Sequence, residues 1–287
     1  MLAVQAVVMS PRAVLHVGPH KVGSTSLQNT LYGGRGALSH DNVTVFPHMF
    51  PGGKWTGAKA CASVAACFAS EERITKLRLN CSKVLFHFET FLHKAKTEGR
   101  GVVLSSEAFD RDEVDIQRLA TTLRGFDTEV FVMHRPFFDW VTSMYSEVHP
   151  QMSLEKYTAD GLVDAVRGKG FNSVAVHGRY SLHFGTVRMR ALENGYITRF
   201  VCDDVRADTL CRLIRTSNTP DAHDNANKSH TYWKGSKCLT EDQKELLWAT
   251  SLFLETKARL LMEKTEPVSV TEFRALFDRV PYRICDN

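Results

Sequence analysis

The chain has 287 residues, of which 43% are hydrophobic and 24% charged, and its formal net charge is +4. This length and composition fit one large α/β domain or two small ones, and the mild positive charge suits an anionic ligand. The charge density is far below that of a nucleic-acid-binding protein, and no segment has the roughly 18 consecutive apolar residues of a membrane helix.

Apolar runs rich in β-branched residues alternate with helical patterns, which predicts a three-layer α/β/α fold with a central, mostly parallel sheet. In chain order, we expect strands at 13–18, 43–46, 102–106, 129–135 and 196–202. Helices are expected at 24–32, through most of 58–97, at 111–124, after Pro136, and at 206–215, 240–264 and 270–279. Residues 51–57 and 219–230 have loop compositions. No repeat or linker interrupts this order, so we expect one domain over residues 1–287.

The segment HVGPHKVGSTSLQNTL, residues 16–31, joins the first predicted strand to the first predicted helix through a glycine-containing turn. Such a turn directs backbone N–H groups and the positive end of the helix to one place, which predicts an anion site. Gly18 and Gly23 have the separation found in the nucleotide-triphosphate P-loop, but Ser24 stands where that motif requires lysine. The lysine lies inside the turn, at Lys21, where it would sit over a shorter phosphate–sulfate group.

Within this segment, GPHKVGSTSLQ resembles the 5'-phosphosulfate-binding loop of sulfotransferases that use PAPS (3'-phosphoadenosine 5'-phosphosulfate). The resemblance is to the branch with a GPHKTGTTSLQ-like loop, in which threonines are usual where this chain has Val22 and Ser24. It implies a P-loop-like sulfotransferase fold, transfer of a sulfuryl group to a hydroxyl or amine, the product PAP, and no metal. The nucleotide-binding residues that it implies in the loop are Lys21, Val22, Gly23, Ser24, Thr25 and Ser26, with Lys21 also stabilising the leaving phosphate.

The family holds the 3'-phosphate with an arginine at a strand end and a serine eight residues later, and Arg135 and Ser143 have this spacing. Arginine supplies charge-assisted hydrogen bonds and serine adds one donor. Taken alone, an Arg-Pro pair at a strand end fits a surface capping arginine equally well. Lys234 and Gly235, in NKSHTYWKGSK, superficially resemble the late basic loop that many sulfotransferases close over the nucleotide.

Sulfuryl transfer to an alcohol or amine benefits from a general base that accepts the proton of the nucleophile. Glu107 follows the strand predicted at 102–106, and ligands of parallel sheets bind beyond the carboxyl ends of strands. It also resembles the Ser-Ser-Glu of the same branch, so we predict Glu107 as the base; a glutamate capping the next helix is the alternative. His20 is a competing base, while His134 is expected to point away from the crevice.

Two weaker features bear on the acceptor and on metals. Lys54 and Trp55 lie in a predicted loop and form an aromatic–cation pair that could line an acceptor pocket, although a solvated loop with a half-buried tryptophan is the plainer interpretation. No paired carboxylates and no His/Cys cluster at metal-ligand spacing occur, so no metal site is predicted. The sequence contains no motif that identifies the acceptor, which is expected to be a small molecule or a glycan, and none that indicates the oligomeric state.

Seven cysteines are scattered along the chain without a Cys-x-x-Cys pair, so their spacing indicates neither a zinc site nor a disulfide framework. The apolar N-terminus lacks a basic region and continues into the first predicted strand, unlike a cleaved signal peptide. We therefore expect a reducing, cytoplasmic location, with the Golgi lumen as the alternative if an N-terminal anchor has been removed.

Two other functions compete with the sulfotransferase. A P-loop kinase or NTPase would bind ATP with Mg²⁺ and requires a lysine directly after Gly23, where this chain has Ser24. A non-catalytic PAPS- or PAP-binding protein would keep Lys21 and Arg135 but transfer nothing to any acceptor.

Overall fold

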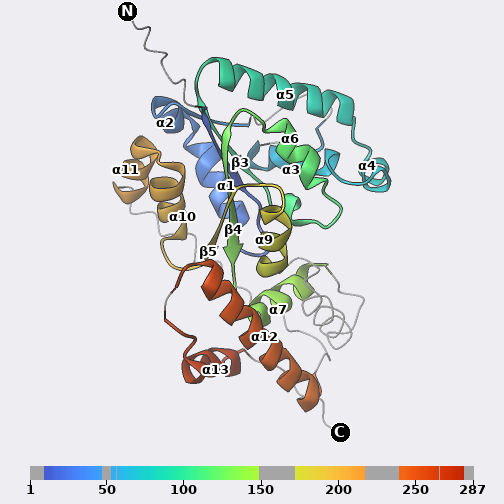
Figure 1. Cartoon of the computed structure of the whole chain (residues 1–287), viewed down its shortest axis with the longest axis vertical. Coiled ribbons are helices and arrows are strands. Elements are labelled where there is room, and N and C mark those ends of the chain that lie inside the picture. Colours follow the sequence, from blue (N-terminus) through green and yellow to red (C-terminus); the bar gives the residue numbers. More distant parts are fainter. Residues whose placement is uncertain are drawn as a thin grey trace, which may run out of the picture.

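The computed structural model of the chain describes residues 10–46, 53–55, 57–148, 172–216, 239–264 and 266–280. Its centre is a five-stranded sheet in the order β2-β3-β1-β4-β5, in which every neighbouring pair is parallel (Figure 1). The strands are β1 (Arg12–His16), β2 (Val43–Val45), β3 (Gly101–Ser105), β4 (Asp127–His134) and β5 (Thr186–Ala191). The predicted α/β class with a parallel central sheet is confirmed.

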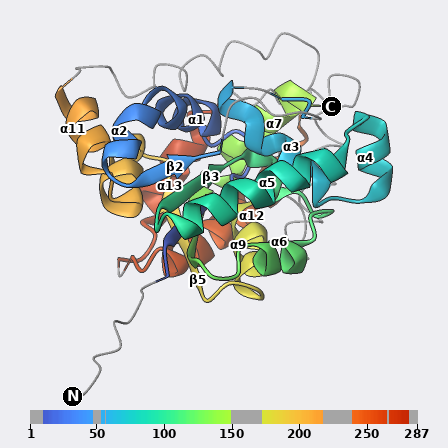
Figure 2. The ribbon, with the colours of Figure 1, turned by 90° about the horizontal axis from the view of Figure 1, so that it is seen from above.

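Helices cover both faces of this sheet (Figure 2). One layer contains α3 (Ala60–Cys67), α5 (Cys81–Thr97), α6 (Ile116–Thr122) and α9 (Ser173–Ser181), with α4 (Glu71–Leu77) beside it. The other contains α1 (Ser24–Gly33), α2 (Arg35–His40), α10 (Tyr196–Arg199) and α11 (Asp208–Thr216). Short 3-10 turns, η1 (Gly57–Lys59) and η2 (Glu107–Asp110), precede α3 and follow β3.

The alternation of side chains along the strands accounts for the two layers. Ala13 and Leu15 pack into the apolar core under α3 and α5, whereas Val14 between them packs into the core under α1 and α2. Val103 in β3 likewise faces the α1 side. Because both faces are buried, strands of this kind have nearly continuous apolar sequences, as the pattern at 102–106 indicated.

A third apolar cluster lies beyond the carboxyl end of β4 and joins α7 (Phe137–Val148), α12 (Glu241–Leu261) and α13 (Val270–Asp278) (Figure 1). Phe138 of α7 packs edge-on against Phe273 and Phe277 of α13. α12 begins with a capping box in which Thr240 and Gln243 exchange side-chain and backbone hydrogen bonds. In the part of the chain that is described, no helix combines the length and apolarity needed to cross a bilayer.

The predicted strand at 196–202 is wrong, because this segment is helical. Gly195, at a φ of 77°, leads into α10, and a π-helical turn η3 (Phe200–Val205) continues it. Phe200 and Val201 are fully buried. A short buried run of apolar residues has no periodicity that distinguishes a helix from a strand, which explains the wrong prediction. The fifth strand is β5, whose arginines conceal it in the sequence; charged side chains are common on edge strands.

Two helix boundaries also differ from the prediction. The helix expected at 111–124 begins only at Ile116, because Asp115 accepts a hydrogen bond from the Arg118 N–H (2.9 Å) and caps it. The helical stretch predicted within 58–97 is divided into α3, α4 and α5.

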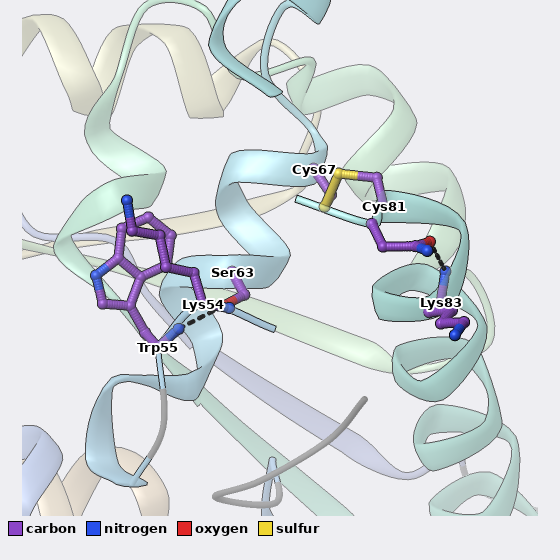
Figure 3. Close-up of a disulfide and its surroundings, with 7 residues drawn as sticks. Lys54, Trp55, Ser63, Cys67, Cys81 and Lys83 are labelled. Carbon is purple, nitrogen blue, oxygen red and sulfur yellow. Dashed lines mark hydrogen bonds between the residues drawn. A yellow bond between two sulfur atoms is a disulfide. The ribbon is translucent and has the colours of Figure 1, made fainter. Parts of the chain in front are cut away.

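The expectation that the cysteines form no disulfides is wrong. Cys67 at the end of α3 is bonded to Cys81 at the start of α5 (Figure 3). Cys202 is bonded to Cys211. These partners are 14 and 9 residues apart, separations that match no local motif, and only the fold brings them together. Cys61 is a buried free thiol, and burial raises its pKa to about 12, so it stays protonated.

Candidate active site

Three adjacent strands place the predicted site residues at one edge of the sheet. β1 lies between β3 and β4, and all three strands run parallel, so the segments after them emerge together. The turn with Lys21 follows β1, Glu107 follows β3, and Arg135 follows β4. This is the edge at which open parallel sheets bind ligands.

The turn between β1 and α1 is held by side chains from the residue after β4, from α7 and from α10. Arg135 Nη1 donates to the Lys21 carbonyl (2.8 Å), Trp140 Nε1 to the His20 carbonyl (2.9 Å), and Tyr196 Oη to the Gly23 carbonyl (2.6 Å). Lys21 itself has a φ of 65°, a conformation uncommon for a residue with a side chain. These three bonds fix the course of the turn before any ligand arrives.

The local structure explains why both positions of the turn, 18 and 23, are glycine. Gly23 has a φ of 77°, and a Cβ there would lie 2.5 Å from Tyr196 Oη, so a side chain would displace the tyrosine that holds this carbonyl. Gly18 has a φ of 91°, and a Cβ there would lie 3.2 Å from the Glu107 Cα. The turn therefore approaches the Glu107 backbone closely, which brings the predicted base beside the predicted anion loop.

The start of α1 has the features of an anion site. Gly23 provides no side-chain cap, and no acidic residue lies in the first turn. Ser24 is buried, and within the described part of the chain its Oγ has no hydrogen-bond partner. Thr25 is exposed, Ser26 is half-buried, and Val22 is buried in the core beneath the turn. An uncapped helix start with an unpaired buried hydroxyl suits an oxyanion such as a phosphate.

Glu107 is held as a carboxylate at the edge of the turn. Gln28 Nε2 donates to Glu107 Oε2 (2.5 Å), and Lys59 Nζ lies 3.3 Å from Glu107 Oε1. Burial opposes ionisation, but hydrogen bonds from its own backbone N–H and from Gln28, with the charges of Lys59 and His20, lower the pKa of Glu107. The group is therefore ionised at neutral pH and able to accept a proton.

His20 is positioned by a residue that the sequence did not single out. The backbone N–H of His20 donates to Asp110 Oδ2, and His20 Nδ1 contacts the same oxygen, both at 2.7 Å. Burial alone would lower the pKa of His20, but the hydrogen bond and charge of Asp110, with the charge of Glu107, raise it. With Nδ1 engaged by a fully buried carboxylate, the imidazole has a fixed orientation, so His20 stays a competing base.

His134 has a different environment. Its Nδ1 contacts Ser173 Oγ at 2.7 Å, and its Nε2 contacts Glu255 at 2.8 Å, both in buried surroundings. Both ring nitrogens therefore have partners within the fold.

Arg135 is engaged by protein groups. Its Nε and Nη2 donate to the two carboxylate oxygens of Asp139 (2.6 and 2.8 Å), in addition to the bond to the Lys21 carbonyl. These contacts use three of the five N–H groups of a guanidinium. Ser143 is buried two turns further along α7. Arg135 therefore clamps the turn, and two N–H groups are left over from these three contacts.

A cavity of about 130 Å³ opens beside Glu107 and His20. Trp55 lines it, and Ser63 Oγ anchors this segment by accepting hydrogen bonds from the Lys54 and Trp55 N–H groups (3.1 and 3.2 Å; Figure 3). Lys54 is exposed, and its Nζ lies 5.7 Å from the centre of the Trp55 ring. The structure thus places Trp55 at the cavity and Lys54 on the outer side of the indole.

Sequence reasoning overlooked Gln28, Lys59 and Asp110. A glutamine on the buried face of α1, inside the loop motif, was a readable signal for Gln28; the other two carried none. Lys234 and Gly235 lie outside the described residues. In the described ranges, no group of three or more His, Cys, Asp or Glu side chains is arranged to hold a metal ion.

No family model matches the chain, and no curated protein is similar to it. Among solved structures, a sulfotransferase from Alicyclobacillus acidocaldarius matches with 14% sequence identity, over 92% of this chain and 98% of that chain, with a TM-score of 0.44. At this identity and TM-score the likeness carries no weight for function, which is inferred from the loop and the geometry around it.

Proposed function

We propose that the chain is a sulfotransferase that moves a sulfuryl group from PAPS to a hydroxyl or amine of an acceptor. The observation that carries the proposal is the juxtaposition of two features. One is a lysine-containing turn that ends in an uncapped helix start with an unpaired buried hydroxyl. The other is an ionised glutamate held against that turn by Gln28 and Lys59.

In this proposal the nucleotide is held in two places. Lys21 and the segment from Val22 to Ser26 bind the 5'-phosphosulfate through the ammonium group, backbone N–H groups and hydroxyls. Arg135 and Ser143 bind the 3'-phosphate, with Asp139 fixing the guanidinium in position.

The chemistry assigned to the chain is general-base catalysis with charge stabilisation. Glu107 accepts the proton of the acceptor hydroxyl as its oxygen forms a bond to sulfur and the bond from sulfur to the 5'-phosphate oxygen breaks. Lys21 stabilises the negative charge that appears on that phosphate oxygen as PAP forms. Asp110 keeps His20 oriented beside the reacting groups.

Several observations bear on the alternatives. A kinase of the P-loop type lacks support because Ser24, not lysine, follows Gly23. A non-catalytic PAP-binding protein has no use for a carboxylate ionised beside the turn. The two disulfides favour an oxidising compartment, so we propose the Golgi lumen rather than the cytoplasm as the place of action.

The nucleotide site is tested by calorimetric titration with PAP in the presence of EDTA. We expect micromolar binding without a divalent metal, because Lys21, the helix start and Arg135 supply the counter-charge. Arg135→Ala should weaken PAP binding by about 2 kcal/mol, or ~30-fold, since a doubly charged phosphate loses its main partner.

Two comparisons separate a phosphate contact from the clamp on the turn. Adenosine 5'-phosphate lacks only the 3'-phosphate, so its binding should change much less than that of PAP in Arg135→Ala. Asp139→Asn loosens the guanidinium but keeps the cation, and should weaken PAP binding less than Arg135→Ala does. Equal losses for the two ligands in Arg135→Ala would show that this arginine is only a clamp.

A further inference from the structure

The cavity beside Glu107 has an apolar wall that accepts a flat ring. Five alanines line it, of which three lie on α3, one just after that helix and one in η2. Trp55 lines it as well, fixed through Ser63. Small side chains opposite an indole leave room for a sugar or phenol ring, and pockets for small molecules combine such walls with a few polar groups.

The polar groups of this cavity are predominantly cationic. Lys59, Arg73 and Arg111 line it, and Glu107 is the one carboxylate among its described lining residues. Lys59 is directed to Glu107 (3.3 Å). Arg73 and Arg111 come from α4 and from the residue that follows η2, so two separate segments bring guanidinium groups to the same space.

Both arginines have hydrogen-bonding capacity that the protein does not use. The Nε atoms of Arg73 and Arg111 are buried, and neither has a hydrogen-bond partner among the residues that the structure describes. Arg73 forms an ion pair with Glu113, but the 3.7 Å between its Nη1 and Glu113 Oε2 is too long for a strong charge-assisted bond. Buried N–H groups of charged side chains are costly when unpaired, so an acceptor oxygen is expected there.

The two guanidinium groups also repel one another. Burial lowers the pKa of Arg73, and the like charge of Arg111 lowers it further, while Glu113 and Asp110 act in the opposite direction. An anion bound between the two arginines would relieve this repulsion and fill the unused hydrogen-bonding capacity together.

A disulfide holds this side of the cavity in place. Cys67, at the end of α3, is bonded to Cys81 (Figure 3). This bond closes the loop that contains α4 and Arg73. A covalent closure of 14 residues restricts the positions of α4 relative to α3. Arg73 is therefore presented to the cavity from a short, constrained segment.

From the unpaired guanidinium groups and the wall beside Glu107, we propose that this cavity binds the acceptor and that the acceptor carries an anionic oxygen group, a carboxylate or sulfate. Arg73 and Arg111 bind that group, Trp55 and the alanines contact the ring, and the ring hydroxyl reaches Glu107. An anionic saccharide has this chemistry. The proposal rests on the proposed sulfotransferase function and narrows its acceptor.

The test is a binding titration that does not depend on turnover. An oligosaccharide of hexuronic acids is titrated into the PAP-bound protein and compared with the carboxyl-reduced oligosaccharide of the same length and with the latter after sulfation. We expect the carboxylated and sulfated forms to bind at least about tenfold more tightly than the neutral one. Arg73→Gln and Arg111→Gln should each remove most of that difference.

Matched controls and a kinetic readout complete the test. Lys76→Gln removes an exposed cation from the same helix, α4, and should leave the difference unchanged. PAP affinity should be unaffected in both arginine variants, since a joint loss would assign the arginines to the nucleotide. With transfer active, the variants should raise KM for the anionic acceptor and leave kcat nearly unchanged.

The outcomes that contradict the proposal are distinct from failure of the sulfotransferase function. Equal affinity for all three oligosaccharides, binding of none, or preservation of the anion preference in both arginine variants would overturn the assignment of the cavity. Anion-selective binding that depends on Arg73 and Arg111, in a protein without transferase activity, would support the cavity and refute the activity.

Discussion

Glu107→Gln is expected to lower kcat by about 10²–10⁴-fold while leaving PAP affinity nearly intact. The glutamine keeps the shape of the side chain and accepts the contact from Gln28 through its amide oxygen, but it cannot accept a proton. The measurement is steady-state transfer from PAPS combined with PAP titration of the same variant. Glu113→Gln, which alters an exposed carboxylate near Arg73, is the control for loss of negative charge alone.

Two measurements identify the base: how the loss of kcat in Glu107→Gln depends on the pKa of the acceptor, and how the wild-type kcat depends on pH. An acceptor of low pKa, such as a nitrophenol, is already ionised, so it should recover most of the lost rate in Glu107→Gln. The lowered pKa of Glu107 means that the wild-type kcat should stay level as pH falls from 8 towards about 5. If His20 is the base, its raised pKa predicts a decline already below about pH 7.

Lys21→Ala is expected to lower kcat by about 10²-fold or more for every acceptor, with a smaller loss of nucleotide affinity. In the proposed mechanism the ammonium group stabilises the negative charge that grows on the bridging oxygen as its bond to sulfur breaks. This stabilisation is required whatever the acceptor is. A nitrophenol should therefore rescue Glu107→Gln but not Lys21→Ala.

The control for Lys21 is Lys83→Ala, because Lys83 is an exposed cation on α5 and does not line the cavity. It should retain nearly full activity. Lys21→Ala with unchanged kcat, or with a loss confined to nucleotide affinity, would show that the lysine only binds the ground state.

The fold class and the glycine-containing turn between β1 and α1 were predictable because local chemistry determines them. Glycines in a turn between an apolar strand and a helix, with Lys21 inside, have few structural interpretations. The register of three parallel strands then brings Glu107 and Arg135 to the same edge. The rule that ligands lie beyond the carboxyl ends of such strands was sufficient to place them together.

The remaining features depend on contacts between distant segments. Asp110 meets His20 from 90 positions away, and Cys67 meets Cys81 across α4, so no spacing rule announces either contact. The run at 196–202 is apolar because a helix buries it against β1 and β4, not because it is a strand. Nothing in the sequence around Arg73 and Arg111 indicates a ligand, and the two arginines became candidates only because they line the same cavity.

The most direct measurement of the central claim is transfer of labelled sulfate from PAPS, in EDTA, to anionic oligosaccharides and to a nitrophenol. We expect label in an acceptor, an equal amount of PAP, and almost none of either with Lys21→Ala. A wild-type protein that binds PAP but labels no acceptor would be a nucleotide-binding module. Phosphoryl transfer from ATP that requires Mg²⁺, with no sulfuryl transfer from PAPS, would contradict the account in favour of a kinase.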